Sequence, residues 1–270
     1  MTKPVVSVIK YDDPYQSLRR ALDLCQGLQD LNPGDKILIK PNLVSWDFDL
    51  PFPPYGVVTT SAVMAALVRI LVEEGFTDLT IGEGPLMIPK TIGQAMYKEL
   101  GYDKLKEKYG VKLVDFNEEK FVKVDCNGLD LSLAEKVLEA DKIINVPVLK
   151  THNQAKVSLG IKNLKGCINR ASKMLCHGKD IDLNYTFPHI AEKLPVALTI
   201  IDGVFGLAKG PGPTGKAERL NLLVASRDIL AADVVGAALL GYTASEVEHL
   251  VYFAKRNGGS VDINDIVVQG

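Results

Sequence analysis

Short apolar runs that alternate with amphipathic stretches constrain the fold of this chain most strongly. The runs at residues 5–9, 36–40 and 79–81 have the length and apolar character of strands covered on both faces of a parallel sheet. Residues 14–31 and 62–74 lie between these runs and repeat apolar side chains at helical spacing. The sequence therefore predicts right-handed βαβ units, in an α/β fold with a mostly parallel sheet and helices on both faces.

The second half of the chain continues this alternation. We predict strands at residues 143–146, 197–201 and 220–224, a helix at residues 227–240 and a last edge strand at residues 266–268. A chain of 270 residues is long enough to bury the core of one large domain. We expect a single α/β domain over residues 1–270, or two lobes that divide at about residue 140.

Charge and cysteine content exclude several classes of protein. The net charge is −2, with 31 Lys and Arg against 33 Asp and Glu, so a dedicated nucleic-acid binder is not expected. No apolar run approaches the ~20 residues of a membrane span, and the N-terminus lacks the apolar region of a signal peptide. We therefore expect a cytoplasmic protein without a membrane partner. The four cysteines show no C-x-x-C spacing, so the chain encodes neither a zinc knuckle nor an iron–sulfur cluster site.

Residues 141–180 carry a local excess of basic side chains. No acidic residue lies between Asp141 and Asp180, but the segment holds His152, His177, Lys142, Lys150, Lys156, Lys162, Lys165, Arg170, Lys173 and Lys179. Such a run can be a solvated basic face, yet these lysines alternate with apolar residues that must pack. Residues 156–162 fit the spacing of a strand and of a helix. We favour a helix from about residue 158, whose N-terminus would suit a phosphate or carboxylate.

Polar side chains stand at the carboxyl ends of several predicted strands. These are Lys40 and Asn42, Glu83, the run from Lys150 to His152, and Asp202. Ligands of open α/β sheets bind beyond the carboxyl ends of the strands. We therefore expect these side chains to converge on one pocket, together with the basic segment.

The side chains of this predicted pocket suit acid–base or nucleophilic chemistry on an anion. His152 titrates near neutral pH and is the candidate proton-transfer group. Crowding and burial should lower the pKa of Lys150 or Lys162, which favours a nucleophilic or imine-forming amine. We predict catalytic roles for His152, Lys162 and Lys150. We predict ligand-binding roles for Lys40, Asn42, Glu83, Thr151, Asn163, Lys165, His177 and Asp202. The sequence assigns no metal ligand and no cofactor.

Two further features receive structural interpretations. Residues 210–216 contain the glycine and lysine spacing of a P-loop, but Ala217 lacks the hydroxyl group that binds Mg²⁺ and two prolines remove N–H donors. A strand, not a helix, is predicted to follow, so we expect a tight turn. His189 and His249 fall on predicted helices, and we interpret both as structural residues.

Several sequence blocks resemble the DUF362 family of uncharacterised α/β proteins. These blocks are residues 40–44, 82–84, 146–152, 162–166, 201–203, 210–213 and 228–233. The resemblance covers roughly residues 5–245 and implies the fold and a pocket, but no reaction, because the function of the family is unassigned. Many members carry a ferredoxin-like iron–sulfur module beside this domain. That module is not found in this sequence, so an iron–sulfur association here would involve a separate partner.

Residues 141–166 show a second, local resemblance, to nickel-pincer lactate racemases. His152 and Lys162 are ten residues apart, as are a histidine and the cofactor-bearing lysine of those enzymes. In that family the histidine moves a proton at the carbon next to a carboxylate. The family has a glycine pair before the lysine, where this sequence has Gly160 and Ile161, and a full set of nickel ligands cannot be placed.

These observations favour an enzyme that transfers a proton on a small anionic ligand, either a carboxylate or a phosphate. One alternative is a redox or metallocofactor accessory protein that docks an acidic iron–sulfur partner through the basic segment. In that case Cys167, Cys176 and His177 would matter most. The other alternative is an anion-binding protein without catalytic activity.

Overall fold

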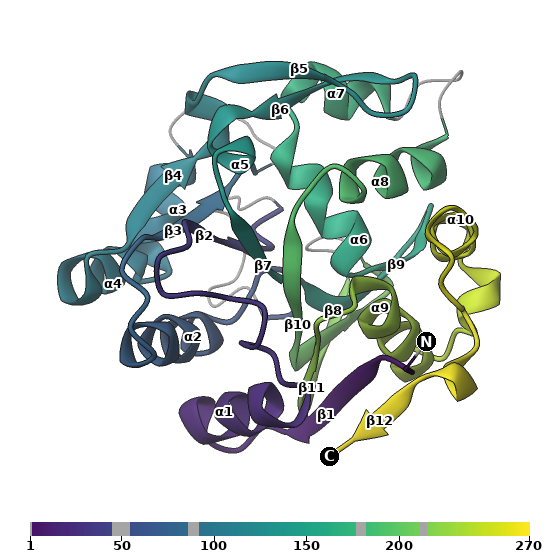
Figure 1. The fold of residues 1–270 in the computed structure, drawn as a ribbon, viewed down its shortest axis with the longest axis horizontal. Coiled ribbons are helices and arrows are strands. Elements are labelled where there is room, and N and C mark those ends of the chain that lie inside the picture. The colour runs from purple at the N-terminus through teal and green to yellow at the C-terminus, as the bar shows by residue number, and fades with distance from the viewer. Residues whose placement is uncertain (1, 45–54, 86–91, 177–181, 211–214) are drawn as a thin grey trace.

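A computed structural model describes residues 2–44, 55–85, 92–176, 182–210 and 215–270 of the chain (Figure 1). Its strands are β1 (Val5–Lys10), β2 (Ile37–Pro41), β3 (Leu79–Glu83), β4 (Lys112–Asp115), β5 (Phe121–Asp125), β6 (Asp130–Ala134), β7 (Lys142–Val146), β8 (Val148–His152), β9 (Lys156–Ser158), β10 (Val196–Ala208), β11 (Lys216–Ser226) and β12 (Val267–Gln269). Its α-helices are α1 (Pro14–Leu24), α2 (Ser61–Glu73), α3 (Ile92–Glu99), α4 (Tyr102–Tyr109), α5 (Glu135–Leu138), α6 (Gly160–Asn163), α7 (Arg170–Leu175), α8 (Leu183–Ala191), α9 (Ile229–Leu239) and α10 (Glu248–Asn257). Short 3₁₀ helices include η2 (Leu164–Cys167).

The main sheet has the order β12-β1-β11-β10-β7-β2-β3-β4. All neighbours from β10 to β4 are parallel, whereas β11 runs antiparallel to both β10 and β1. The predicted α/β fold with a mostly parallel sheet is therefore confirmed. Strands β5 and β6 form a separate antiparallel hairpin, and β4 joins the main sheet in the parallel direction.

Helices cover both faces of the sheet (Figure 1). Successive side chains of a strand point to opposite faces, so Ile39 and Ile144 enter the core under α1 and α2. Leu38 and Ile143 enter the second core, which packs against α8, α9 and α10. Burial on both faces explains why the central strands read as continuous apolar runs. None of the helices in the described ranges is long and apolar enough to cross a membrane.

Residues 156–162 contain a strand and then a helix. Strand β9 pairs antiparallel with β8, and Lys156 begins it with a φ of 60°, a conformation suited to the tight turn of a hairpin. The chain then stays extended at Leu159 before α6 begins at Gly160. The expectation of a helix from about residue 158 was therefore partly wrong, because Lys156 to Ser158 pair with β8 and the helix begins only at Gly160.

Three other boundaries differ from the prediction. The first helix ends at Leu24, not at residue 31, because the chain turns at Gln26, whose φ is 52°. Strand β10 continues past Asp202 to Ala208, so Asp202 lies within a strand and not at its end. Lys150 lies within β8, which follows β7 after Pro147 and pairs with the distal part of β10.

Candidate functional site

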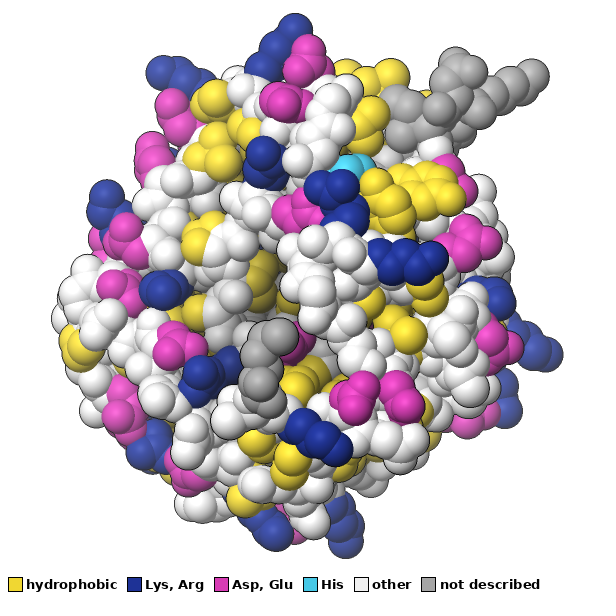
Figure 2. Space-filling model, turned by 45° about the vertical axis from the view of Figure 1, so that its right-hand side comes forward, with side chains coloured by type: hydrophobic (Ala, Val, Ile, Leu, Met, Phe, Trp, Pro, Cys, Tyr) yellow, Lys and Arg dark blue, Asp and Glu magenta, His cyan; other side chains and the backbone are white. Residues whose placement is uncertain are grey.

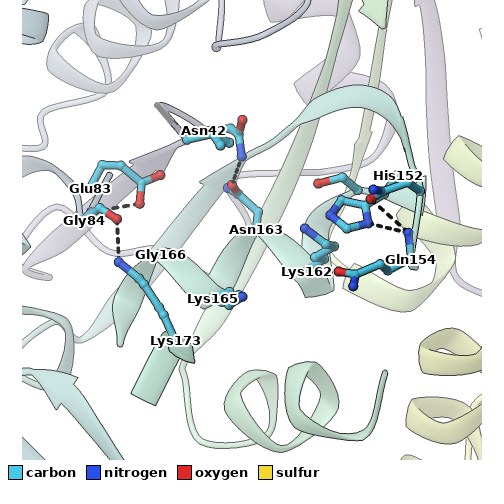
Figure 3. A pocket seen from close by; sticks show the side chains of 13 residues that line it. Asn42, Glu83, Gly84, His152, Gln154, Lys162, Asn163, Lys165, Gly166 and Lys173 are labelled. Carbon is cyan, nitrogen blue, oxygen red and sulfur yellow. Dashed lines mark hydrogen bonds between the residues drawn. The ribbon is translucent and has the colours of Figure 1, made fainter. Parts of the chain in front are cut away.

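A cavity of about 300 Å³ opens beyond the carboxyl ends of β2 and β3 (Figure 3). Its wall comes from these strand ends, from the β8–β9 hairpin and from α6, η2 and α7. The lining residues are Asn42, Val44, Glu83, Gly84, His152, Asn153, Gln154, Ser158, Lys162, Asn163, Lys165, Gly166 and Lys173. This size suits a small organic ligand, at the lower end of the usual range of ligand cavities.

The cavity brings together six of the residues that the sequence singles out. Asn42, Glu83, His152, Lys162, Asn163 and Lys165 all line it. Lys40 and Lys150 are fully buried and do not line the cavity, but they donate hydrogen bonds to the lining residues Glu83 and Asn42. His177 lies outside the described residues.

Thr151 and Asp202 do not line the cavity. The hydroxyl group of Thr151 accepts a hydrogen bond from the backbone of Gly210, which ties β8 to the end of β10. Asp202 is buried, and burial raises its pKa. Its carboxylate accepts hydrogen bonds from the backbone N–H groups of Thr60 at 2.6 Å and Val204 at 3.0 Å, so it fixes the residue that precedes helix α2.

A buried ion pair forms one end of the cavity. The Lys40 ammonium and the Glu83 carboxylate lie 2.6 Å apart, with side-chain exposures of 0% and 3%. Glu83 also accepts hydrogen bonds from the backbone N–H groups of Leu43 and Gly84. Because its carboxylate is already neutralised by Lys40, Glu83 adds no net negative charge to the pocket.

Gly166 packs directly against this ion pair. A Cβ atom at Gly166 would lie 1.9 Å from a carboxylate oxygen of Glu83 and 2.7 Å from Nζ of Lys40. We expect Gly166→Ala to lower the free energy of unfolding by about 1–3 kcal/mol, the usual cost of an overpacked core. Urea unfolding would measure this loss. Gly34→Ala is the matched control, because nothing lies within 4 Å of its added Cβ. Equal stability of the two variants would contradict the close contact.

A one-way chain of hydrogen bonds fixes the amide side chains behind the cavity. Lys150 donates to Asn42 at 2.6 Å, Asn42 donates to Asn163 at 2.7 Å and Asn163 donates to Asn145 at 2.8 Å. Asn145 then donates to the carbonyl oxygen of Gly160 at 2.9 Å. Each amide is thereby held in one orientation. Lys150 thus acts as the anchor of this chain and not as a group that faces the cavity.

Asp233 holds the segment that presents Lys162. From α9, its carboxylate accepts the backbone N–H groups of Gly160 at 2.6 Å and Ile161 at 2.8 Å, at the start of α6. Burial raises the pKa of Asp233 to about 7. A lone aspartate in the apolar helix sequence of α9 was the available signal for this role, but sequence reasoning did not assign it.

Three lysines give the cavity its positive character. Burial, followed by the charges of Lys150 and Lys165, lowers the pKa of Lys162 to about 7. Burial also lowers the pKa of Lys173 to about 8 and that of Lys165 below its ordinary value. Among the described residues, no carboxylate oxygen lies within 4 Å of Nζ of Lys162 or Lys173. Sequence reasoning counted Lys173 in the basic segment without placing it in the site.

His152 faces the same end of the cavity as Lys162 (Figure 3). Its Nδ1 accepts hydrogen bonds from the backbone N–H groups of Gln154 and Ala155, each at 3.1 Å. A ring nitrogen that accepts these bonds carries no proton, so the proton of the neutral ring lies on Nε2. In this conformation His152 offers a hydrogen-bond donor to a ligand.

The cysteines do not form an exposed cluster. All four are buried free thiols, and burial raises the pKa of Cys167 to about 12. No group of three or more His, Cys, Asp or Glu side chains within the described residues could hold a metal ion. Figure 2 shows one face of the molecule, on which basic and acidic side chains are interspersed.

Comparison with known proteins identifies the family. The family described as "Domain of unknown function (DUF362)" matches residues 37–238. The chain belongs to this family. A relative in Synechocystis sp., "Thylakoid-associated protein sll1697", is 29% identical over 225 residues, which cover 81% of this chain and 67% of the relative.

The DUF362 chain also resembles a solved structure, the lactate racemase apoprotein from Thermoanaerobacterium thermosaccharolyticum. The TM-score is 0.55 at 17% sequence identity. The likeness covers 91% of this chain but only 58% of the racemase chain. At this low identity it shows a shared fold alone.

Proposed function

We propose that this DUF362 protein is an enzyme that binds a small carboxylate or phosphate in the cavity and transfers a proton at the bound ligand. The observation that carries the proposal is the charge balance of the cavity. Among the described residues, Lys162 and Lys173 line it with no carboxylate oxygen within 4 Å of either amine, whereas the lining carboxylate of Glu83 is neutralised by Lys40. An anionic ligand would supply the missing negative charge and raise the lowered lysine pKa values.

The two groups at the other end of the cavity suit proton transfer. A lysine with a pKa of about 7 is roughly half unprotonated at neutral pH, so Lys162 can exchange a proton with a bound ligand there. His152, through Nε2–H, can stabilise negative charge that develops on a ligand oxygen. This assignment moves the role of proton-transfer group from His152 to Lys162.

The structural neighbour suggests which ligands to test first. Its name denotes an enzyme that acts on lactate, a small hydroxycarboxylate. Lactate and inorganic phosphate therefore represent the two anion classes. The amine of Lys162 opens into the cavity, so this residue could also carry a covalently attached group like that of the nickel-pincer racemases.

The accessory-protein alternative makes a different prediction for the basic segment. Lys150 and Lys173 are buried, so neither is available to dock an acidic iron–sulfur partner in this conformation. His177, which that alternative emphasises, lies outside the described residues. Partner binding that falls steeply with salt and ignores small anions would favour the accessory protein over the enzyme.

Two substitutions of His152 distinguish the roles of its two ring nitrogens. His152→Asn can keep an acceptor near Nδ1 for Gln154 and Ala155 but removes the donor at Nε2. His152→Gln can keep a donor near Nε2 but removes the Nδ1 acceptor. We expect His152→Asn to weaken anion binding by about 10–100-fold, the value of a hydrogen bond to a charged group. His152→Gln should retain more of the affinity.

Isothermal titration calorimetry with lactate and phosphate would measure both affinities, and thermal unfolding would confirm that each variant is folded. Full affinity in His152→Asn would show that Nε2 does not contact the ligand.

A further inference from the structure

The amine of Lys162 differs from the other buried amines near the cavity. Lys40 is paired with Glu83, Lys150 donates to Asn42, and Lys173 donates to the carbonyl oxygen of Gly84 at 2.6 Å. Lys162 has no such acceptor among the described residues. Its Nζ atom lies over the face of the Phe187 ring, 5.4 Å from the ring centroid.

The groups around Lys162 disfavour its charged form. Lys150 and Lys165 repel a positive charge at this position. Behind Phe187 lies His249, whose ring meets the Phe187 ring edge to face at 5.8 Å. Both ring nitrogens of His249 are buried and lack a partner within the described structure, and burial with the nearby Lys162 lowers its pKa to about 3. The His249 side chain is therefore neutral at pH 7 and adds no charge beside Lys162.

These features suit an amine that reacts through its lone pair. An ammonium group serves to bind an anion, and Lys165 and Lys173 already line the cavity for that purpose. An amine without a hydrogen-bond acceptor among the described residues, and partly unprotonated at neutral pH, can in addition form a covalent bond to an electrophilic carbon. Nε2–H of His152, at the same end of the cavity, can bind the oxygen attached to that carbon (Figure 3).

We propose that Lys162 forms an imine with a small anionic ligand that carries a carbonyl carbon, as in the 2-oxo acids. This inference rests on the proposed function and specifies its substrate class. The amine lone pair forms the N–C bond, the two amine protons leave with the carbonyl oxygen as water, and a C=N bond remains. The imine nitrogen then takes up a proton from solvent, and the resulting iminium acidifies the neighbouring C–H bond, which provides the proton for transfer.

Reductive trapping tests this proposal. The purified full chain, first shown by intact mass to be unmodified at Lys162, is incubated with pyruvate and then with borohydride. Peptide mapping should find one reduced adduct per chain at Lys162, formed faster as the pH rises through about 7. Lys162→Arg keeps a positive charge without a nucleophilic amine and should give no adduct. Lys112→Arg changes an exposed lysine and should react like the wild type.

The controls separate this inference from the proposed function. Lactate has no carbonyl carbon to form an imine at C2, so its binding tests the anion site alone. If lactate or phosphate binds but pyruvate gives no adduct at Lys162, imine formation is wrong and the anion site stands. Adduct formation that persists in Lys162→Arg, or that spreads evenly over exposed lysines, would also overturn the assignment. Failure of all three anions to bind would overturn both proposals.

Discussion

Glu83→Gln is expected to lower the free energy of unfolding by about 3–5 kcal/mol. The substitution leaves the ammonium group of Lys40 fully buried without its carboxylate. The acceptors that remain, the amide oxygen of the introduced glutamine and the carbonyl oxygen of Pro41 at 3.1 Å, carry no charge. The ion pair also meets the backbone of Gly166, so its loss should disturb the end of the cavity that Glu83 lines. Urea unfolding at neutral pH would measure the change.

A surface ion pair provides the matched control for this prediction. Asp78 and Lys112 are 2.8 Å apart, but their side chains are 39% and 63% exposed. Asp78→Asn should therefore cost at most about 1 kcal/mol. The double variant Lys40→Met, Glu83→Gln should recover part of the loss of Glu83→Gln, because it removes the unpaired charge. Similar losses for Glu83→Gln and Asp78→Asn would contradict the role assigned to the buried pair.

Lys162→Met is expected to change the pH dependence of stability. A lysine with a lowered pKa contributes stability that is present above its unfolded pKa, near 10.5, and is lost as the pH falls through about 7. The contribution of this lysine to the free energy of unfolding should therefore rise between pH 7 and 10. Each such lysine adds about 1.4 kcal/mol per pH unit, and Lys150 and Lys173 contribute to the same rise. Removal of the Lys162 amine should reduce this slope by the contribution of one group.

Urea unfolding at pH 7.5, 8.5 and 9.5 would measure the slope. Lys112→Met, at an exposed position, should leave it unchanged. The same Lys162→Met variant should bind lactate or phosphate at least about 100-fold more weakly at neutral pH, because a charge-assisted contact is lost. A variant with the wild-type slope would show that Lys162 titrates as an ordinary lysine, and the assigned chemistry would then be wrong.

The fold was predictable because its signal is local. Apolar runs and helical spacing identified the central strands, and parallel strands place their carboxyl ends at one edge of a sheet. That rule alone brought Asn42 and Glu83 to the same cavity. The rule failed for Asp202, because β10 is 13 residues long and passes it. Strand length depends on the pairing partners, and local sequence does not reveal them.

The long-range contacts of the site were not predictable from local patterns. Asp233 holds the start of α6 from 73 residues away in the sequence, and Asn145 joins the amide chain through Asn163. Lys173 reaches the cavity because α7 folds back over the end of β3, where it meets Gly84. The sequence indicated a proton-transfer role for His152. Only the structure shows that its Nδ1 already accepts a hydrogen bond from the backbone of Gln154.

The measurement that tests the central claim most directly is proton uptake on anion binding. Calorimetric titration with lactate and with phosphate at pH 8, in buffers of different ionisation enthalpy, gives the number of protons bound with each ligand. Lys162 is mostly unprotonated at this pH, so an anion that raises its pKa should cause net proton uptake, approaching one proton per chain. Lys162→Met should lose most of this uptake. Saturable binding without proton uptake, or uptake that is unchanged in Lys162→Met, would contradict an anion site built around this lysine.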